Sequence, residues 1–286
     1  MLLGIHVSTA GKIYEAIGRA VKLGCNTMQI FSRIPQQWRR FDLKRQDIEE
    51  FCCRRRQTRI QPLFVHASYL INLSSPDATL YKKCIQAYIE DIREAGALGA
   101  EYLVTHMGSH KGAGEEKGIK RFTRALDHIL NKTKDIPVTI LLENTAGSGS
   151  NLGYTFKHHQ SILSGLKNTK RIGLCIDTAH AYAAGYNIAE RSGLKTMLNE
   201  IDNLVGLDKI KLIHLNDVKS KLGSRVDRHD HIGKGHIGLA GMKLILNHPS
   251  LRNLPFILET PKDSKFADKR NLERVRILRR KVKVKK

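Results

Sequence analysis

Eight short apolar runs that alternate with longer amphipathic segments predict an α/β fold, a single-domain (β/α)₈ TIM barrel. Runs rich in Val, Ile and Leu are typical of buried parallel strands, and the segments between them have the three-to-four-residue spacing of helices. No Pro-, Gly- or Ser-rich linker divides the 286 residues, so one closed barrel is expected. The predicted strands span residues 2–7, 27–31, 62–65, 102–105, 138–142, 172–176, 210–213 and 256–258.

The helical segments and the C-terminus complete this organisation. Residues 77–98 and 116–130 are predicted helices, and Asp77, which follows Pro76, is a typical helix start. We assign the barrel to residues 1–262 and a C-terminal segment with a basic tail to 263–286. The tail is interpreted as a mobile arm that adds phosphate contacts, a nuclear-import signal, or a solvated terminus without a role. Its basic residues are Arg274, Arg276, Arg279, Arg280, Lys281, Lys283, Lys285 and Lys286.

The composition favours a partner with many negative charges. The chain has 49 Lys and Arg against 27 Asp and Glu, a formal charge of +22, and the body stays basic without the tail. Such a field attracts polyanions, most commonly nucleic acid. We see neither a secretory signal nor an apolar stretch of about 20 residues. The expected location is therefore the cytoplasm with its nucleoid, or the nucleus in a eukaryote, and not a membrane or the exterior. Five cysteines without CxxC spacing indicate reduced thiols.

Residues that commonly bind metals fall at the ends of six predicted strands. In a parallel barrel these ends converge on one face, so residues far apart in the sequence become neighbours. Taken singly, each has a simpler explanation as a hydrogen-bonded or capping residue. Together with three more in nearby loops, they predict a site for two or three ions with bridging carboxylates. The nine candidates are His66, His106, Glu143, Asp177, His180, His214, Asp227, His229 and Glu259.

Several motifs in order resemble the endonuclease IV family of apurinic/apyrimidinic endonucleases. The resemblance runs from Gly4-Ile5-His6-Val7-Ser8 to Leu258-Glu259-Thr260-Pro261, nearly the whole chain apart from the basic tail. The other motifs are Phe64-Val65-His66-Ala67-Ser68-Tyr69, Leu142-Glu143-Asn144-Thr145, Asp177-Thr178-Ala179-His180, His214-Leu215-Asn216-Asp217 and Asp227-Arg228-His229.

The resemblance implies a three-zinc site. His and carboxylate ligands also accept Mn²⁺, which could occupy some positions. Glu143 and Glu259 are the expected catalytic residues, and Glu143 would bridge two ions. His6 and His231 lie outside the ligand set and are interpreted as residues that support the site or have a structural role. The implied ligand sets are His66, His106 and Glu143; Glu143, Asp177, His214 and Glu259; and His180, Asp227 and His229.

The implied activity is base-excision repair of double-stranded DNA by a monomeric, metal-dependent hydrolase. The enzyme would cut the phosphodiester 5′ to an abasic site, leave a 3′-hydroxyl, and also remove 3′-blocking sugar fragments. Tyr69 and Leu70 follow a strand end and are expected to wedge into the duplex. The other expected DNA contacts are Gln36, Trp38 and Arg228.

The loop at Gln36 departs from the family, whose members usually have an arginine there. Arg33 and Arg39 are the candidates for supplying the missing charge. Trp38 has two interpretations, as a base-stacking residue or as a packing anchor for the loop, and Tyr69 could also pack on the barrel rim.

Two other functions remain open. A xylose-isomerase-like sugar isomerase or epimerase would use one ion in the quartet of Glu143, Asp177, His214 and Glu259, but it leaves the other five candidates and the basic charge unexplained. The second is a nucleic-acid-binding module whose metals are only structural. A closed, buried, Cys-rich site on a small fold would favour it, but the candidate site is not Cys-rich and the fold is not small.

Overall fold

Eight parallel strands form the centre of the molecule in the computed structural model, which describes residues 1–34, 37–38 and 43–279. Hydrogen bonding gives the order β1-β10-β7-β6-β5-β4-β3-β2. All neighbouring strands in this sheet run parallel, as the predicted barrel requires. The strands are β1 (Leu3–Ile5), β2 (Met28–Phe31), β3 (Leu63–His66), β4 (Tyr102–His106), β5 (Thr139–Glu143), β6 (Ile172–Asp177), β7 (Ile210–His214) and β10 (Phe256–Leu258).

The first and second strands close the sheet into a barrel. His6 pairs with Gln29 in a parallel bridge, and the backbone N–H of Val7 donates to the carbonyl of Gln29 at 2.7 Å. The strands approach closely at Gly4, where a Cβ atom would lie 2.0 Å from the carbonyl oxygen of Thr27. Only glycine fits this contact without moving backbone. The predicted (β/α)₈ barrel is therefore confirmed.

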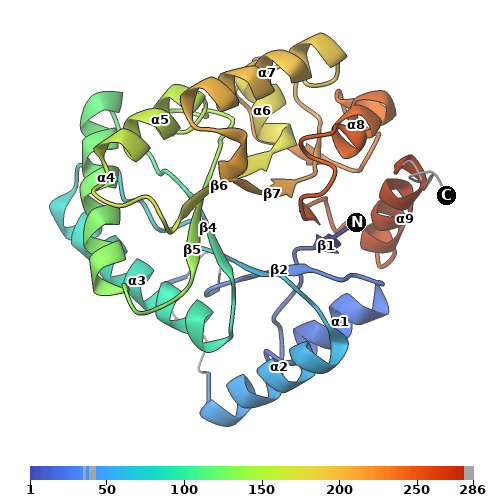
Figure 1. Ribbon diagram of the computed structural model, residues 1–286, viewed down its shortest axis with the longest axis horizontal. Helices are drawn as coiled ribbons and strands as arrows, with labels where there is room; N and C mark the ends of the chain where they lie inside the picture. The colour runs from blue at the N-terminus through green and yellow to red at the C-terminus, as the bar shows by residue number, and fades with distance from the viewer. Residues whose placement is uncertain (35–36, 39–42, 280–286) are drawn as a thin grey trace.

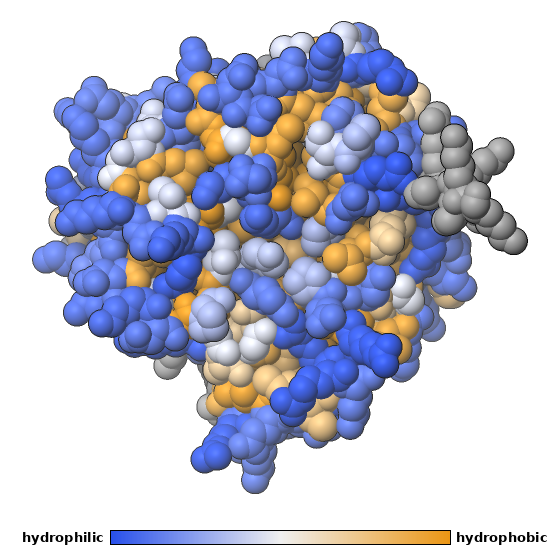
Figure 2. All heavy atoms as spheres, in the orientation of Figure 1, coloured by the Kyte–Doolittle hydropathy of each residue, from blue (hydrophilic) through white to orange (hydrophobic). Residues whose placement is uncertain are grey.

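Helices surround the strands on the outside, and Figure 1 shows them as a ring around the barrel. Their apolar faces and the outward side chains of the strands form the main core. In Figure 2, hydrophilic residues cover most of the rim of the visible face, with hydrophobic residues in the gaps between them. The helices are α1 (Glu15–Lys22), α2 (Arg45–Thr58), α3 (Ala78–Ala97), α4 (Glu115–Lys132), α5 (Phe156–Gly165), α6 (Thr178–Ala184), α7 (Arg191–Leu204), α8 (Gly238–Asn247), α9 (Ala267–Leu278) and the 3₁₀ helix η1 (Leu207–Lys209).

Both helices predicted in the sequence are present within a few residues of their expected ends. Asp77 caps α3, because its side chain accepts a hydrogen bond from the N–H of Leu80 at 2.7 Å. The loop after β7 contains a short antiparallel pair, β8 (Asp217–Val218) and β9 (His229–Asp230). None of the helices in the described ranges combines the length and apolar character that a membrane crossing requires.

The C-terminal segment is partly docked. Leu272 and Val275 of α9 are buried in the main core. Arg274 donates to the carbonyl of Ile232 at 3.1 Å, and Arg276 to that of Gly24 at 2.8 Å. Arg279, just past α9, donates to a backbone carbonyl of α8. The expectation of a mobile arm is therefore wrong for these three arginines, whose guanidinium groups satisfy carbonyls at loop and helix ends.

The remaining tail residues, Arg280, Lys281, Lys283, Lys285 and Lys286, lie outside the described residues. The domain boundary at residue 262 stays a prediction.

Candidate metal centre

The alternation of side chains along a strand explains why six candidate ligands meet inside the barrel mouth. Six strands each direct one buried residue into the barrel interior, where these side chains form a separate apolar cluster: Phe64, Val104, Leu141, Cys175, Leu212 and Ile257. Side chains two positions apart lie on the same face of a strand. The residue two positions after each member therefore points inward one layer further toward the carboxyl ends. Those residues are His66, His106, Glu143, Asp177, His214 and Glu259.

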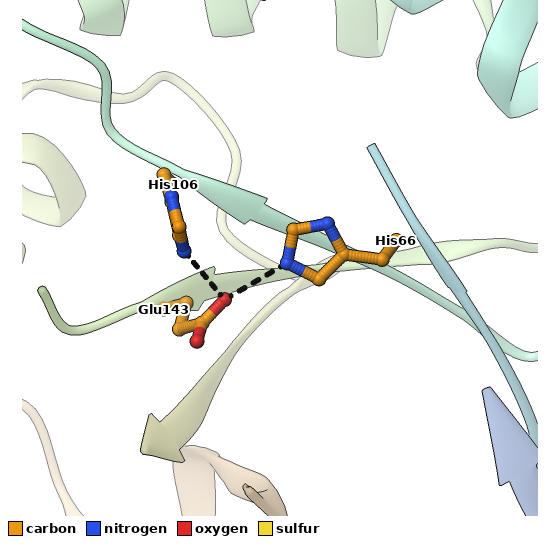
Figure 3. A group of neighbouring side chains, drawn as sticks. All are labelled: His66, His106 and Glu143. Atoms are coloured by element: carbon orange, nitrogen blue, oxygen red, sulfur yellow. Dashed lines mark hydrogen bonds and ion pairs between the residues drawn. The ribbon is translucent and has the colours of Figure 1, made fainter. Parts of the chain in front are cut away.

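The first group of neighbouring ligands comes from β3, β4 and β5 (Figure 3). Nε2 of His66 and Nε2 of His106 each lie 3.1 Å from Oε2 of Glu143. His66 and Glu143 are buried, and His106 is half-buried toward the barrel mouth. This geometry gives two imidazoles and one carboxylate oxygen converging on one point.

The second group lies on the other oxygen of the same carboxylate. Oε1 of Glu143 is 3.1 Å from Nδ1 of His214, and Oε2 of Glu259 is 3.3 Å from that nitrogen. Asp177 completes this set, whose ligand atoms all lie within 4.8 Å of one another. Glu143 thus presents one oxygen to each group, the position of a bridging ligand.

The third group combines the end of β6 and the first turn of α6 with β9 and the loop before it. Asp177, His180 and His229 offer atoms within 4.8 Å of one another. Asp227 lies beside them, with Oδ2 3.0 Å from Nε2 of His180 and Oδ1 3.3 Å from Nε2 of His229. All nine residues predicted as ligands are therefore brought together, and Asp177 stands between the second and third groups.

Hydrogen bonds to the ring nitrogens show that this donor set fits divalent ions. Four imidazoles each use one ring N–H for a protein oxygen, which directs the other nitrogen toward the carboxylates. Such a nitrogen and a carboxylate oxygen are both acceptors, so a cation or a proton must lie between them. Nε2 of His229 is buried and makes no hydrogen bond within the described part of the chain. The four bonds are His66 to Ala67 O, His180 to Asn144 O, His214 to Gln29 Oε1 and His229 to Glu259 O.

The electrostatics of the site keep its carboxylates ionised. Burial alone raises the pKa of Glu143, but the charges of His106 and His214 outweigh it and hold this pKa well below its usual range. Burial likewise opposes the shift at Asp227, where the hydrogen bond and charge of His180 lower the pKa to about 2. Ionised oxygens at neutral pH are the form that binds metal.

Gln29 and His6 support the cluster from β2 and the end of β1. Nε2 of Gln29 donates to Oε1 of Glu259 at 2.6 Å, while its Oε1 accepts from His214 at 2.8 Å. Nδ1 of His6 lies 3.0 Å from Oε1 of Glu259. Sequence reasoning missed Gln29, although one polar residue inside the apolar run Met28-Gln29-Ile30-Phe31 was an available signal. His231 bonds to Asp263 and Asn271 instead.

Two buried asparagines hold Asp177, and sequence reasoning assigned neither a role. Asn216 donates to Oδ2 of Asp177 at 2.7 Å and accepts from the N–H of Glu259 at 2.8 Å. Asn144 accepts from the N–H of Asp177 at 2.7 Å. Each follows a ligand closely in its motif, which could have indicated a positioning role.

The residues expected to contact DNA differ in exposure. Tyr69 is 56% exposed beside the metal centre, with its ring centroid 5.7 Å from that of His66. Leu70 is half-buried and Arg228 is exposed. Trp38 is half-buried against the core, and Nζ of Lys83 lies 4.1 Å from its ring centroid. Gln36 and Arg39 lie outside the described residues.

Arg33 does not supply the missing positive charge. Its side chain is 2% exposed, and Nε donates to Oδ1 of buried Asp91 at 2.9 Å. Nη1 donates to the carbonyl of Trp38 at 2.9 Å. The suggestion that Arg33 reaches DNA is therefore wrong, because its charge is used inside the protein to hold the loop.

Comparisons with known proteins agree with this geometry. The family model described as "Xylose isomerase-like TIM barrel" matches residues 17–281. "Probable endonuclease 4" of Methanoculleus marisnigri is 43% identical over 278 residues, covering 97% of this chain and 99% of that protein. The protein of the same name from Halothermothrix orenii is 42% identical, covering 98% of this chain and all (100%) of that protein.

A solved structure gives the same result. The crystal structure of endonuclease IV from Thermus thermophilus superposes with a TM-score of 0.86 at 35% identity, covering 97% of this chain and 98% of that one. The shared barrel, the identity over full length and the assembled ligand cluster show that the chain belongs to the endonuclease IV family of nuclease hydrolases.

Proposed function

We propose that this protein is an apurinic/apyrimidinic endonuclease that cuts double-stranded DNA 5′ to abasic sites, using three zinc ions. The observation that carries the proposal is the shared carboxylate of Glu143, which offers one oxygen to each of two ligand groups. A third group lies beside them. Three adjoining groups suit phosphodiester hydrolysis, in which charge must be neutralised at the attacked phosphate and at both oxygens in line.

The reaction is hydrolysis without a covalent protein intermediate. Water adds to phosphorus, the bond from phosphorus to the 3′ oxygen breaks, and that oxygen takes up a proton to become a 3′-hydroxyl. Bound divalent ions would supply Lewis acidity and make a nearby water easier to deprotonate. The same chemistry would remove sugar fragments from blocked 3′ ends, a 3′-repair diesterase activity.

The protein's own residues orient and protect the reacting groups. Glu143 and Glu259 keep ionised oxygens toward the centre, and Gln29 fixes the Glu259 carboxylate through the 2.6 Å hydrogen bond. The apolar layer below excludes water from that side, which strengthens every charge interaction above it. Mn²⁺ is an acceptable occupant of some positions, because imidazole and carboxylate ligands also bind it.

Damage selection is proposed to come from the rim. Tyr69 is exposed beside the cluster, Leu70 follows it in the loop after β3, and the exposed Arg228 lies in the loop that carries Asp227. An aromatic ring and an apolar side chain can fill the gap left by a missing base, where extrusion costs least. The formal charge of +22 favours DNA as the partner. The enzyme is proposed to act as a monomer, in the nucleoid or in a nucleus.

The decisive experiment is incision of a labelled duplex with one abasic site against the same intact duplex. We expect a selective nick with a 3′-hydroxyl from metal-replete protein. The variant Glu259→Gln should lose incision and keep most DNA affinity, whereas Glu273→Gln, an exposed change of the same charge on α9, should behave as wild type. Joint loss of fold and DNA binding in Glu259→Gln would instead indicate metals with a purely structural role.

The alternative is a xylose-isomerase-like sugar isomerase or epimerase. The quartet of Glu143, Asp177, His214 and Glu259 is assembled here and would serve a single ion. That function gives no role to the two imidazoles of the first group or to the third group. Absence of incision by fully loaded protein, with turnover of a ketose or aldose phosphate, would support it over our proposal.

A further inference from the structure

A hollow separate from the metal centre lies on the side of the barrel, between α4 and α5. Its volume is about 1440 Å³. The hollow exists because α5 has 10 residues and α4 has 18, so α5 covers only part of its neighbour. The loop after α5 continues along α4, where the N–H of Lys167 donates to Asp127 at 3.1 Å. The result is an elongated groove rather than a closed cavity.

Basic side chains line this groove in regular rows. Lys120, Arg124 and His128 are four residues apart on α4, so they share one helix face. On α5, Lys157 faces the groove, followed four and eight residues later by the small Ser161 and Gly165. Small residues on one wall leave room for an occupant between the two rows.

The acidic residues of the groove are already engaged. Glu116 pairs with Lys120 at 2.7 Å, and Glu115 accepts from the hydroxyl of Tyr154 at 2.6 Å. Asp127 accepts the N–H of Lys167. The lining has six Lys and Arg residues against these three carboxylates, so it keeps an excess of positive charge.

Four exposed cations provide this excess. Within the described ranges we find no carboxylate at ion-pair distance from Arg124, Lys134, Lys157 or Lys167. They lie at several points along the groove and do not converge on one spot. With 18 residues, α4 is about 27 Å long, so the charges follow an extended track. An extended track suits a polymeric anion better than a small phosphate compound.

One end of the groove lies at the rim of the metal centre. Tyr154, which bonds to Glu115 at this end, also has the guanidinium of Arg225 4.4 Å from its ring centroid. Arg225 belongs to the loop that carries Asp227 and His229. A chain of phosphates leaving the barrel mouth here would meet the groove directly.

We propose that this groove binds the phosphate backbone of a DNA segment that flanks the segment held at the barrel mouth. This inference rests on the proposed function, because it takes DNA as the substrate. The contact is with phosphates alone, so it carries no sequence information and holds undamaged DNA during search.

Two triple variants with equal charge loss test the groove. The groove variant is Arg124→Gln, Lys134→Gln and Lys167→Gln, at positions away from the barrel mouth. The control is Lys22→Gln, Lys243→Gln and Lys269→Gln, exposed residues of α1, α8 and α9 on the other side of the ring (Figure 1). All six side chains are exposed, so both variants should fold.

Binding of undamaged duplex is measured against salt concentration, with one long duplex and one that covers only the barrel mouth. For the long duplex we expect the groove variant to lose affinity about tenfold and its salt slope to fall by about 2 to 3. The control should change its slope by less than about 1. Binding of the short duplex, and its incision at an abasic site, should stay as in wild type.

Equal losses in the two variants would overturn the inference, since net charge alone would then explain the binding. Loss of inorganic phosphate binding in the groove variant, with unchanged DNA binding, would also overturn it. Failure of the wild type to cut abasic DNA would refute the proposed function without changing the result for the groove.

Discussion

Two layers inside the barrel differ completely in chemistry, although their residues are only two positions apart on the same six strands. The lower layer is apolar, as in Leu141 and Leu212, and the upper layer consists of candidate metal ligands, as in Glu143 and His214. Both layers point inward, and all their members are buried except His106 and Glu259, which are half-buried toward the barrel mouth. The lower layer stabilises the barrel and excludes water, and the upper layer needs cations to be stable, since isolated buried charges are costly.

The difference between the layers can be tested by substitutions in each one. The largest effect, on incision and metal content, is expected from Glu143→Gln in the upper layer. The amide keeps the shape of the side chain but loses the charge shared by two ligand groups. We expect incision to fall about a thousandfold or more and metal to be lost from both groups. Elemental mass spectrometry and an incision assay give the two readouts.

Glu49→Gln on the exposed face of α2 is the matched control for this change and should keep metal and activity. A Glu143→Gln protein that binds the wild-type amount of metal would contradict the bridging position of this carboxylate.

The next largest effect is expected from Leu141→Ala in the lower layer. Leu141 is fully buried between the strands, so the truncation leaves a cavity. The free energy of unfolding should fall by about 2 to 5 kcal/mol, and the folded fraction should keep its metal. Chemical denaturation and metal analysis measure these quantities.

Leu239→Ala, at an exposed position of α8, should change the unfolding free energy by less than about 1 kcal/mol. Loss of metal from folded Leu141→Ala protein would mean that the two layers are not separable in the way that we infer.

The barrel and its ligand face could be predicted from the sequence because both depend on local patterns. Apolar runs give the strands, and a residue just past a run lies at the carboxyl edge whatever its distance along the chain. Asp77 is predictable as a helix start for the same reason, since a cap is set by its immediate neighbours.

Features that depend on long-range contacts could not be predicted in this way. Arg33 lies 58 positions from Asp91, and no local pattern indicates that they pair. Arg276 donates to the carbonyl of Gly24, 252 residues away. Because this partner is so distant in the sequence, the run of basic residues by itself predicts only a mobile arm. The hydrogen bonds of Gln29 to His214 and Glu259 likewise join β2 to strands far along the chain.

A smaller effect is expected from Gln29→Leu, which removes support for the upper layer without removing a ligand. Gln29 orients both Glu259 and His214, so its loss should weaken metal affinity about 10- to 100-fold. Competition with a metal chelator measures this affinity directly.

Gln57→Leu, an exposed change of the same kind on α2, should leave metal affinity unaltered. Unchanged metal affinity in Gln29→Leu would show that the hydrogen bonds from His6 and the backbone suffice to hold Glu259.

Two buried histidines extend the comparison of the layers to a single side-chain type. His214 lies among carboxylates: burial alone lowers its pKa, but Cys175 and the glutamates outweigh burial and raise it well above the ordinary value. His159 on α5 is equally buried but lies beside Phe156, and burial lowers its pKa to about 3. Because both rings are buried, the opposite directions of their pKa shifts come from the carboxylates that surround His214 and that, among the described residues, are absent around His159.

The smallest expected effect is therefore a pH dependence from His159. Above pH 6.5 the ring is neutral in the folded and unfolded states, so it adds no penalty. As the pH falls from 6.5 toward 3, the unfolded chain takes up a proton that the folded ring refuses, and the unfolding free energy drops by about 1.4 kcal/mol per pH unit. His159→Leu should remove this part of the acid sensitivity, and His128→Leu at an exposed position of α4 should keep it. Denaturation curves between pH 7 and pH 4 test this prediction. Parallel pH profiles for wild type and His159→Leu would mean that the buried ring accepts its proton in the folded state.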